Sequence, residues 1–419
     1  MGFSRRQVVL ILTVIVVTTS VYYISMSPSW SPKPYTKTPH EMSTAEVLMQ
    51  ARITSGNYNK SSLPIKVTIS AEFRKNIPVN NAYWNQRLHQ VFEQLDREAV
   101  LTSKQLSTFP CLSNLNIPKE ISDFDSYPLI YKNFLPTIDC REFPIIINQP
   151  QKCAPLQGGG HTNRTFLLVA IKSLPKHFEE RQTIRETWGR EQVFDGGLRV
   201  HSVFLLGSTG ENDPDLQLLL NYESSLFGDL LQWGFQDTFF NLTLKDNLFL
   251  LWTTMFCPDA QFIFKGDDDV FANPKQIVSY LRSLDAEQAS KLYAGQIVTQ
   301  ASPIRDPKSK YYVPKTFYDG PYPPYAGGGG YLFSGALIKP LYHISQALPL
   351  YPIDDVYTGM CFQALGVTPL RHEQFQTFDI WEKDRQDPCV HSKILLVHRR
   401  SPQQTKQLWN AIHSHELKC

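Results

Sequence analysis

Residues 262–271 read FIFKGDDDVF, and this stretch decides the fold. Phe262, Ile263 and Phe264 are continuously apolar rather than alternating, which predicts a strand buried on both faces. The acids that follow would then lie at the carboxyl end of the strand, where open α/β sheets bind their ligands. The stretch therefore predicts an α/β sheet with an acidic site at one edge.

The acidic site itself consists of Asp267, Asp268 and Asp269. Three adjacent carboxylates repel one another strongly unless a cation lies among them. Carboxylate oxygens suit hard cations such as Mn²⁺ or Mg²⁺, which commonly also hold phosphate oxygens. A solvated acidic turn is the alternative, but the apolar Val270 and Phe271 directly behind the acids favour a metal site.

Upstream of the acids, strand-like apolar runs alternate with helix-like runs. The expected strands are 165–172, 200–207, 229–235 and 261–265, and the expected helices are 177–188, 215–227 and 242–257. This alternation predicts a mostly parallel, Rossmann-like sheet with flanking helices. The first strand is followed by no G-x-G-x-x-G, and the chain contains no G-x-x-x-x-G-K-[ST]. These absences argue against a dinucleotide oxidoreductase and a P-loop enzyme.

Composition limits the class of protein further. The 419 residues are 42% hydrophobic and carry a net charge of +2. The length suits one large domain or two ordinary ones, and the balanced charge gives no reason to expect a nucleic-acid partner. The seven cysteines show no C-x-x-C spacing, which argues against a zinc cluster and allows disulfides in an oxidising compartment. Their odd number leaves at least one thiol without a partner in the chain.

The N-terminus predicts a membrane anchor. Residues 8–26 form an uncharged run that spans roughly 28 Å as a helix, close to a thin bilayer core of about 27 Å. Arg5 and Arg6 precede the run, and the positive-inside rule keeps that short end, residues 1–7, in the cytosol. We therefore expect a single-pass type II membrane protein, with a flexible lumenal stem over 27–79.

A cleaved signal peptide is the alternative to the anchor. Ser25 and Ser27 are small enough for a cleavage site, but Pro28 would follow the cut, and the apolar run exceeds a usual h-region. Glycosylation sequons agree with a lumenal location. They begin at Asn59, Asn163 and Asn241. Beyond the stem, we expect an irregular N-terminal part over 80–164 that packs on a catalytic domain over 165–419.

The first expected helix carries Arg181 and Arg185, which are four residues apart and share one face. Two guanidiniums just after the first strand suit a diphosphate. A solvated face, paired with neighbouring glutamates, is an equally supported alternative.

Residues 322–335 read YPPYAGGGGYLFSG. Glycine lets the backbone approach a ligand with no Cβ in the way, which makes Gly328 and Gly329 candidate donor-binding positions. The flanking Tyr325 and Tyr331 would offer aromatic faces to sugar rings. A tight β-bend is the alternative.

Two later segments supply a candidate base and a candidate metal ligand. Asp354 and Asp355 begin a helix-like run, where one carboxylate suits an N-cap and the other a catalytic base. Residues 394–400 read ILLVHRR, so His398 ends an expected buried strand. A lone histidine at a strand end is usually structural. The acidic site lacks a nitrogen ligand, however, which favours a ligand role for His398.

Together these segments resemble the Golgi β-1,3-N-acetylglucosaminyltransferases of glycosyltransferase family 31, and most closely the members that extend poly-N-acetyllactosamine. The resemblance covers 82–419 and departs mainly in the stem and in GGGHTN, residues 158–163. It rests on KGDDDVF, PPYAGGGGYLFSG, YPIDDVYTG, IKSLPKHFEERQTIRETWG and FFNLTLKDNLFLLW.

The resemblance implies a GT-A fold and a UDP-GlcNAc donor. It also implies an inverting transfer in β-1,3 linkage to terminal galactose of N-acetyllactosamine, on glycoproteins or glycolipids. The location would be the Golgi membrane, with homo- or hetero-oligomers among Golgi transferases as conceivable assemblies. Carried over from the family, Asp269 is the metal ligand with His398 as its partner, and Asp355 is the base. Asp267 and Asp268 would contact the nucleotide, chiefly its ribose. The family likewise places the two arginines, 181 and 185, near the donor.

Two other functions stay open. A β-1,3-galactosyltransferase could use the same scaffold, although those enzymes usually have a glycine-poorer loop where this chain has 326–330. A non-catalytic lumenal lectin or chaperone could retain the fold, but the intact acids at 267–269 and 355 argue against it.

Overall fold

The computed structural model describes residues 67–98, 113–114, 116–154, 164–210 and 213–419, all within one compact unit, Tyr58–Cys419. The expected anchor over 8–26 and the sequons at Asn59 and Asn163 lie outside these ranges. Across the ranges that are described, no helix combines the length and apolar character needed to cross a membrane.

Within the described residues the strands form one nine-stranded and one three-stranded sheet. The large sheet has the order β1-β5-β4-β2-β6-β9-β8-β10, with β3 paired to β4, and the small one has the order β11-β12-β7. The strands are β1 (Ile145–Ile147), β2 (Thr165–Lys172), β3 (Gln192–Phe194), β4 (Leu198–Ser208), β5 (Leu230–Gln236), β6 (Phe262–Asp267), β7 (Val270–Ala272), β8 (Tyr293–Val298), β9 (Tyr325–Ser334), β10 (Leu370–Arg371), β11 (Phe375–Gln376) and β12 (Leu396–His398).

The large sheet is parallel at its centre and mixed at its flanks. The neighbouring strands β5, β4, β2 and β6 run parallel, as the sequence predicts. However, β1 pairs antiparallel with β5, and β9 pairs antiparallel with both β6 and β8. The sheet is therefore mixed: the four central strands pair parallel and so do β8 and β10, whereas β1, β3 and β9 run in the opposite direction. The antiparallel β9 matters for the site, because its amino end meets the carboxyl ends of the parallel strands.

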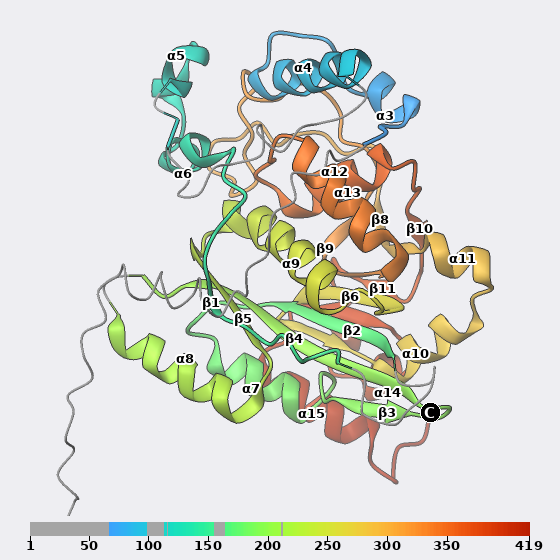
Figure 1. Cartoon of the computed structure of the whole chain (residues 1–419). Helices are drawn as coiled ribbons and strands as arrows, with labels where there is room; N and C mark the ends of the chain where they lie inside the picture. Colours follow the sequence, from blue (N-terminus) through green and yellow to red (C-terminus); the bar gives the residue numbers. More distant parts are fainter. Residues whose placement is uncertain (1–66, 99–112, 115, 155–163, 211–212) are drawn as a thin grey trace, which may run out of the picture. The chain divides into compact units, whose positions relative to one another are not determined.

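Helices cover both faces of this sheet. The longer ones are α4 (Tyr83–Glu98), α7 (Phe178–Glu186), α8 (Pro214–Phe227), α9 (Leu242–Phe256), α10 (Pro274–Ser283), α12 (Ile338–Ala347), α13 (Asp354–Ala364) and α15 (Pro402–Ile412). The shorter ones are α3 (Ala71–Asn76), α5 (Ile117–Glu120), α6 (Leu129–Phe134), α11 (Ala286–Lys291) and α14 (Pro388–His391). Figure 1 shows α9, α12 and α13 on one side of the central strands and α7, α8 and α15 on the other.

Two cores follow from this layering, and β2 divides its side chains between them. Leu168 and Ala170 belong to the core under α9, α12 and α13, whereas Leu167 and Val169 belong to the core over α7 and α10. Every residue of β2 is buried, which explains the unbroken apolar run between Thr165 and Lys172 at its two ends. All the helices and strands expected upstream of the acids are present, with ends shifted by at most two residues or so.

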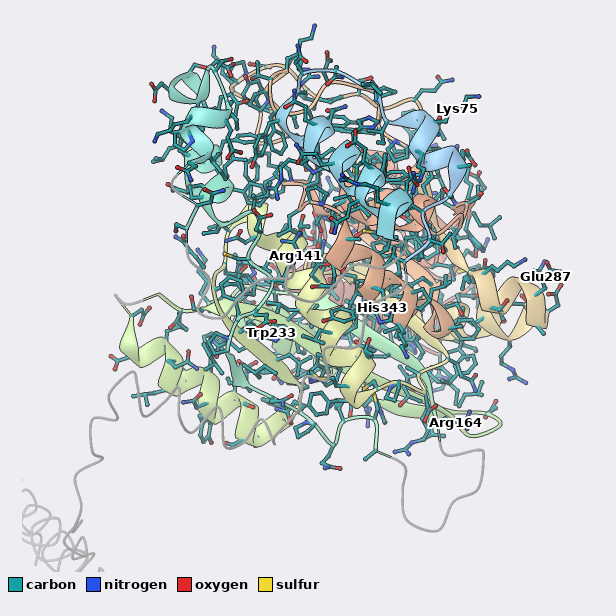
Figure 2. All side chains as sticks on the ribbon, turned by 45° about the horizontal axis from the view of Figure 1, so that its top comes forward. Lys75, Arg141, Arg164, Trp233, Glu287 and His343 are labelled. Atoms are coloured by element: carbon teal, nitrogen blue, oxygen red, sulfur yellow. A yellow bond between two sulfur atoms is a disulfide. The ribbon has the colours of Figure 1, made fainter. Side chains whose placement is uncertain are left out.

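The N-terminal described residues pack on the first of these cores. Trp84 of α4 is fully buried and makes edge-to-face contacts with Tyr318 and Tyr351, each at 5.4 Å between ring centroids. Ordered structure also starts before Asn80, because α3, capped by Ser70, lies within the expected stem. Side chains of the interior, such as Trp233, contrast with Lys75 and Glu287 at the periphery (Figure 2).

Disulfides join distant parts of this unit. Cys153 pairs with Cys257 and Cys389 with Cys419, and Cys140 is also disulfide-bonded. Cys361 is a buried free thiol, which accounts for the odd number of cysteines.

Candidate active site

A cleft of about 750 Å³ opens at the edge of the sheet where β2 and β6 end and β9 begins. This is the edge at which the sequence places the acids. All the predicted site residues except the two arginines of α7 line it. They are Asp267, Asp268, Asp269, Gly328, Gly329, Asp355 and His398.

Each carboxylate of the acidic triplet faces its own basic partner. Asp267 lies 2.9 Å from Nζ of Lys172, and Asp268 lies 2.9 Å from Nδ1 of His177. Asp269 lies 3.0 Å from Nε2 of the third partner, His398. The repulsion expected among three adjacent acids is thus reduced by basic groups from three separate elements.

Strand pairing brings the histidine to the acids. In the small sheet His398 of β12 lies opposite Val270 of β7, directly after Asp269. Its Nδ1 lies 3.0 Å from the carbonyl oxygen of Thr377. An N–H at Nδ1 donates to that oxygen and leaves the Nε2 lone pair directed at the carboxylates, as in many metal-binding histidines. Burial alone would lower the pKa of His398, but Asp269 and then Asp267 outweigh it and raise the pKa.

These residues fit a divalent cation. One ligand atom each from Asp267, Asp269 and His398 lies within 4.8 Å of the others. Two carboxylates and one imidazole suit Mn²⁺ or Mg²⁺, with sites left for phosphate oxygens. The geometry adds Asp267 to the pair that the sequence identified. Burial is the main influence on Asp267 and raises its pKa, so a bound cation would relieve an unfavourable buried charge.

Asp355 also lines the cleft, in the first turn of α13. Neither it nor Asp354 is the N-cap of that helix, a position that Ile353 occupies without a side-chain hydrogen bond. Instead, the Asp355 carboxylate accepts hydrogen bonds from the backbone N–H groups of Gly328, at 3.0 Å, and Val356, at 2.8 Å. Burial, followed by repulsion from Asp354, raises the pKa of Asp355 to about 7. A carboxyl group with this pKa can take up a proton near neutral pH.

Lys172 joins the acidic triplet to α13, and it is not among the site residues that the sequence predicts. Its Nζ lies 2.6 Å from Asp354 and 2.9 Å from Asp267. Burial would lower the pKa of Lys172, but Asp267 and Asp354 keep it well above the usual value. The sequence does contain a signal for Lys172, because this lysine follows the apolar run of β2 at the edge of the sheet where the acids lie.

The four consecutive glycines are neither a loop nor a bend, because they lie inside β9. Side chains of the site pack directly against their backbone. A Cβ on Gly328 would lie 3.3 Å from Oδ2 of Asp355, and one on Gly329 would lie 2.9 Å from Nδ1 of His398. The glycines thus make room for the side chains of Asp355 and His398. Of the flanking tyrosines only Tyr325 lines the cleft, whereas Tyr331 is buried.

Arg181 and Arg185 do not lie in the cleft, which corrects the expectation that they hold a diphosphate. Arg181 is fully buried and makes a two-point contact with Glu223, at 2.8 and 2.7 Å. Arg185 pairs with Asp229 and Glu223, each at 2.7 Å. Arg181 also donates to the carbonyl oxygens of Leu174 and Pro175, and so it supports the loop beside the cleft.

Aromatic side chains also line the cleft. Phe239, Tyr311, Tyr322 and Tyr325 line it. The Nζ of Lys310 lies 5.1 Å from the ring centroid of Phe239 and 4.8 Å from that of Tyr311. Aromatic faces of this kind suit the apolar faces of sugar rings, so the cleft has an acidic half and an aromatic half.

Comparison with known proteins agrees with this chemistry. A family model described as Galactosyltransferase matches residues 179–373. The N-acetyllactosaminide beta-1,3-N-acetylglucosaminyltransferases 2 of Mus musculus and Homo sapiens are both 45% identical over 350 residues, which cover 81% of this chain and 86% of each relative. The UDP-GlcNAc:betaGal beta-1,3-N-acetylglucosaminyltransferase 7 of Rattus norvegicus is 37% identical, over 90% of this chain and 93% of its own length.

Solved structures are more distant. A glycosyltransferase involved in the glycosylation of the major capsid of PBCV-1 aligns with a TM-score of 0.28 and 12% identity, over 58% of this chain and 98% of that chain. That likeness is too weak to bear on the fold. The identity with the three relatives extends over most of both chains. The chain is therefore a glycosyltransferase and belongs to the family of β-1,3-N-acetylglucosaminyltransferases.

Proposed function

We propose that the protein moves GlcNAc from UDP-GlcNAc, in β-1,3 linkage and with inversion, to terminal galactose of N-acetyllactosamine glycans. The names of the relatives describe β-1,3-N-acetylglucosaminyltransferases, and one of them also names UDP-GlcNAc and a β-galactose. One observation within the chain carries the proposal. A carboxylate with a pKa of about 7, Asp355, shares a cleft with the cation-binding group of Asp267, Asp269 and His398.

Asp355 is the proposed base. In its deprotonated form it takes the proton from the 3-hydroxyl of galactose while that oxygen attacks C1 of the donor sugar. The N–H groups of Gly328 and Val356 fix the orientation of the carboxylate, since each holds one of its oxygens. Attack from the side opposite the departing UDP converts an α-linked donor to a β-linked product, so no covalent enzyme intermediate is required.

The acidic half of the cleft is the proposed donor side. Asp267, Asp269 and His398 would hold Mn²⁺ or Mg²⁺, and the bound ion would neutralise charge on the departing diphosphate. Lys172 and His177 keep Asp267 and Asp268 in place. We assign contact with the ribose to Asp268 and place the donor sugar along Gly328 and Gly329. The aromatic half, with Tyr325, would receive the acceptor.

The proposal extends to the location and the fold. We propose a GT-A fold held in the Golgi membrane by the anchor over 8–26, with the catalytic part in the lumen. The disulfides Cys153–Cys257 and Cys389–Cys419 support an oxidising compartment. Asn241, whose sequon is the one that falls among the described residues, is half-buried, and its side-chain N–H donates to the carbonyl oxygen of Gln236.

A β-1,3-galactosyltransferase is the second candidate, because the matching family model is described as Galactosyltransferase. The two functions differ in the donor, so one experiment separates them. Initial rates are measured with UDP-GlcNAc and with UDP-Gal on the same N-acetyllactosamine acceptor. We expect far higher catalytic efficiency with UDP-GlcNAc. The reverse order would replace the proposed donor, and no transfer from either would favour the lectin or chaperone alternative.

A further inference from the structure

Arg399 combines an unusual backbone with an unusual position. It follows His398 directly, is exposed and lines the acidic half of the cleft. Its φ is 62°, in the left-handed region that side chains other than glycine rarely adopt. Only Gln300 and Asp379 share this property among the non-glycine residues of the described ranges. Strained backbone of this kind persists where the surrounding structure enforces it, often at functional sites.

Two arginines, the buried Arg400 and the half-buried Arg385, enforce the turn at Arg399. Nη1 of the fully buried Arg400 donates to the carbonyl oxygens of His398 and Arg399, at 3.0 and 3.1 Å. Arg385 donates a further hydrogen bond to the carbonyl oxygen of Arg399, at 3.1 Å. Both guanidiniums also pair with Asp379. The backbone N–H of Arg400 completes the clamp by donating to the carbonyl oxygen of Asp269, at 2.7 Å.

Among the described residues, Arg399 is a positively charged residue of this cleft without a carboxylate partner. The other such residue, Lys310, lies over the rings of Phe239 and Tyr311. Lys172, His177, Lys245 and His398 line the same cleft, and each has a carboxylate partner. The carbonyl oxygen of Arg399 accepts hydrogen bonds, but its side chain makes no hydrogen bond or ion pair with any residue that the structure describes. A strained turn therefore holds an uncommitted guanidinium beside the carboxylates of the cation-binding group.

We propose that Arg399 binds the diphosphate of the nucleotide donor and stays bound to it as UDP departs. This role rests on the proposed function, which supplies a nucleotide-sugar donor. A single divalent cation does not neutralise a nucleoside diphosphate, and the planar fork of arginine matches phosphate oxygens at two points. Arg399 would thus have the role that the sequence assigned to Arg181 and Arg185.

The test separates binding from backbone strain. UDP affinity is measured by calorimetry, in the presence of Mn²⁺, on the full chain in detergent and on its Arg399→Gln, Arg399→Lys and Arg399→Gly variants. Charge-assisted contacts of this type predict a loss of about ten- to a hundred-fold for Gln and Gly, and a smaller loss for Lys. Arg399→Gly also relieves the left-handed strain, so its Tm should equal or exceed that of wild type by about 1–3 °C.

Uridine and a remote variant complete the design. The affinity for uridine, which lacks the diphosphate, should stay within two-fold or so of wild type in all Arg399 variants. Arg190→Gln removes an exposed arginine that does not line the cleft and should leave UDP affinity unchanged. Unchanged UDP affinity in the Arg399 variants, or an equal loss for uridine, would overturn the inference alone. A wild-type chain that binds no UDP would overturn the proposed function with it.

Discussion

Two clusters of charged side chains in this protein, both of which the sequence made candidates for the site, differ in how their charges are matched. The α7 cluster consists of Arg181, Arg185, Glu223 and Asp229, in which two cations and two anions satisfy one another at 2.7–2.8 Å. The cleft cluster consists of five carboxylates, at 267, 268, 269, 354 and 355, with Lys172, His177 and His398 as their basic partners. Of the two clusters, only the cleft cluster has more carboxylates than basic partners.

The difference separates scaffold from site. In a buried cluster whose charges are all paired, no charged group is free to bind a ligand, and a ligand would not stabilise it further. The cleft cluster is incomplete, and burial and repulsion from Asp354 raise the pKa of Asp355 to about 7. A bound cation would balance the excess of carboxylates, and a substrate hydroxyl would provide a hydrogen-bond partner for Asp355. Substitutions in the cleft cluster should therefore change chemistry more than stability, and substitutions in the α7 cluster should do the reverse.

The largest effect is expected for Asp269→Ala. This change removes one of three proposed ligands, and no carboxylate of the α7 cluster can replace it. We expect no detectable transfer and a large loss of UDP affinity in Mn²⁺, with Tm near that of wild type. His398→Ala should weaken metal affinity by about ten-fold or more, a loss typical of a disturbed metal shell. Full wild-type activity in excess chelator would show that the cleft needs no cation.

Asp355→Asn should have the next largest effect on turnover. Asparagine keeps the size of the side chain but cannot accept the proton, so kcat should fall by roughly 10²–10⁴. The KM for the donor should stay near that of wild type. Asp354→Asn is the matched neighbour and should reduce turnover less, because Asp354 pairs with Lys172 rather than facing the acceptor. If the Asp354 variant lost more turnover while remaining folded, the base would be misassigned.

Arg181→Met tests the other side of the comparison. It leaves Glu223 with only Arg185 as a partner in a buried site, and breaking such a pair typically costs about 3–5 kcal/mol. We expect a loss at the lower end of that range in urea unfolding, because Arg185 remains. UDP affinity of the folded protein should be unchanged. A specific loss of UDP affinity with little loss of stability would restore Arg181 to the donor site.

The sequence predicts the elements of this site better than the partners of its charges. A buried apolar run followed by three acids is a local pattern, and so is a pair of aspartates, Asp354 and Asp355, at a helix start. The sequence therefore indicates both segments, whereas the choice of Asp355 as the base rests on the family resemblance. The Arg181–Glu223 pair joins residues 42 positions apart and leaves no local signature. The requirement for glycine at 328 and 329 has no local signature either. Its cause is the close packing of Asp355 and His398, which lie elsewhere in the sequence.

A pH profile probes the incomplete charge of the cleft directly. Since the pKa of Asp355 is about 7, the fraction in the basic form falls about ten-fold per pH unit below that value. Turnover should therefore rise from pH 5 to a plateau above pH 7, and the rise should disappear in Asp355→Asn. Stability should run the other way. The folded-state pKa is raised, so this group favours folding at low pH, and that contribution is lost as the pH rises through 7. The change in the free energy of unfolding caused by Asp355→Asn should therefore be more stabilising at pH 8 than at pH 5.

The smallest effects are expected for substitutions of Gly328 and Gly329, which should separate the contribution of Asp355 from that of His398. On Gly328 a Cβ would be only slightly too close to Asp355, at 3.3 Å, whereas on Gly329 it would force His398 to move, at 2.9 Å from Nδ1. Gly328→Ala should reduce kcat by about three- to ten-fold by displacing the base, with metal affinity unchanged. Gly329→Ala should instead raise the Mn²⁺ concentration needed for half-maximal activity by about ten-fold and leave kcat at saturating metal near wild type. Each variant is the control for the other, because both add one methyl group to adjacent positions of β9. If both variants changed kcat and metal affinity alike, the glycines would act through the strand as a whole. The expected separation between an effect on the metal ligand His398 and an effect on the base Asp355 would then be wrong.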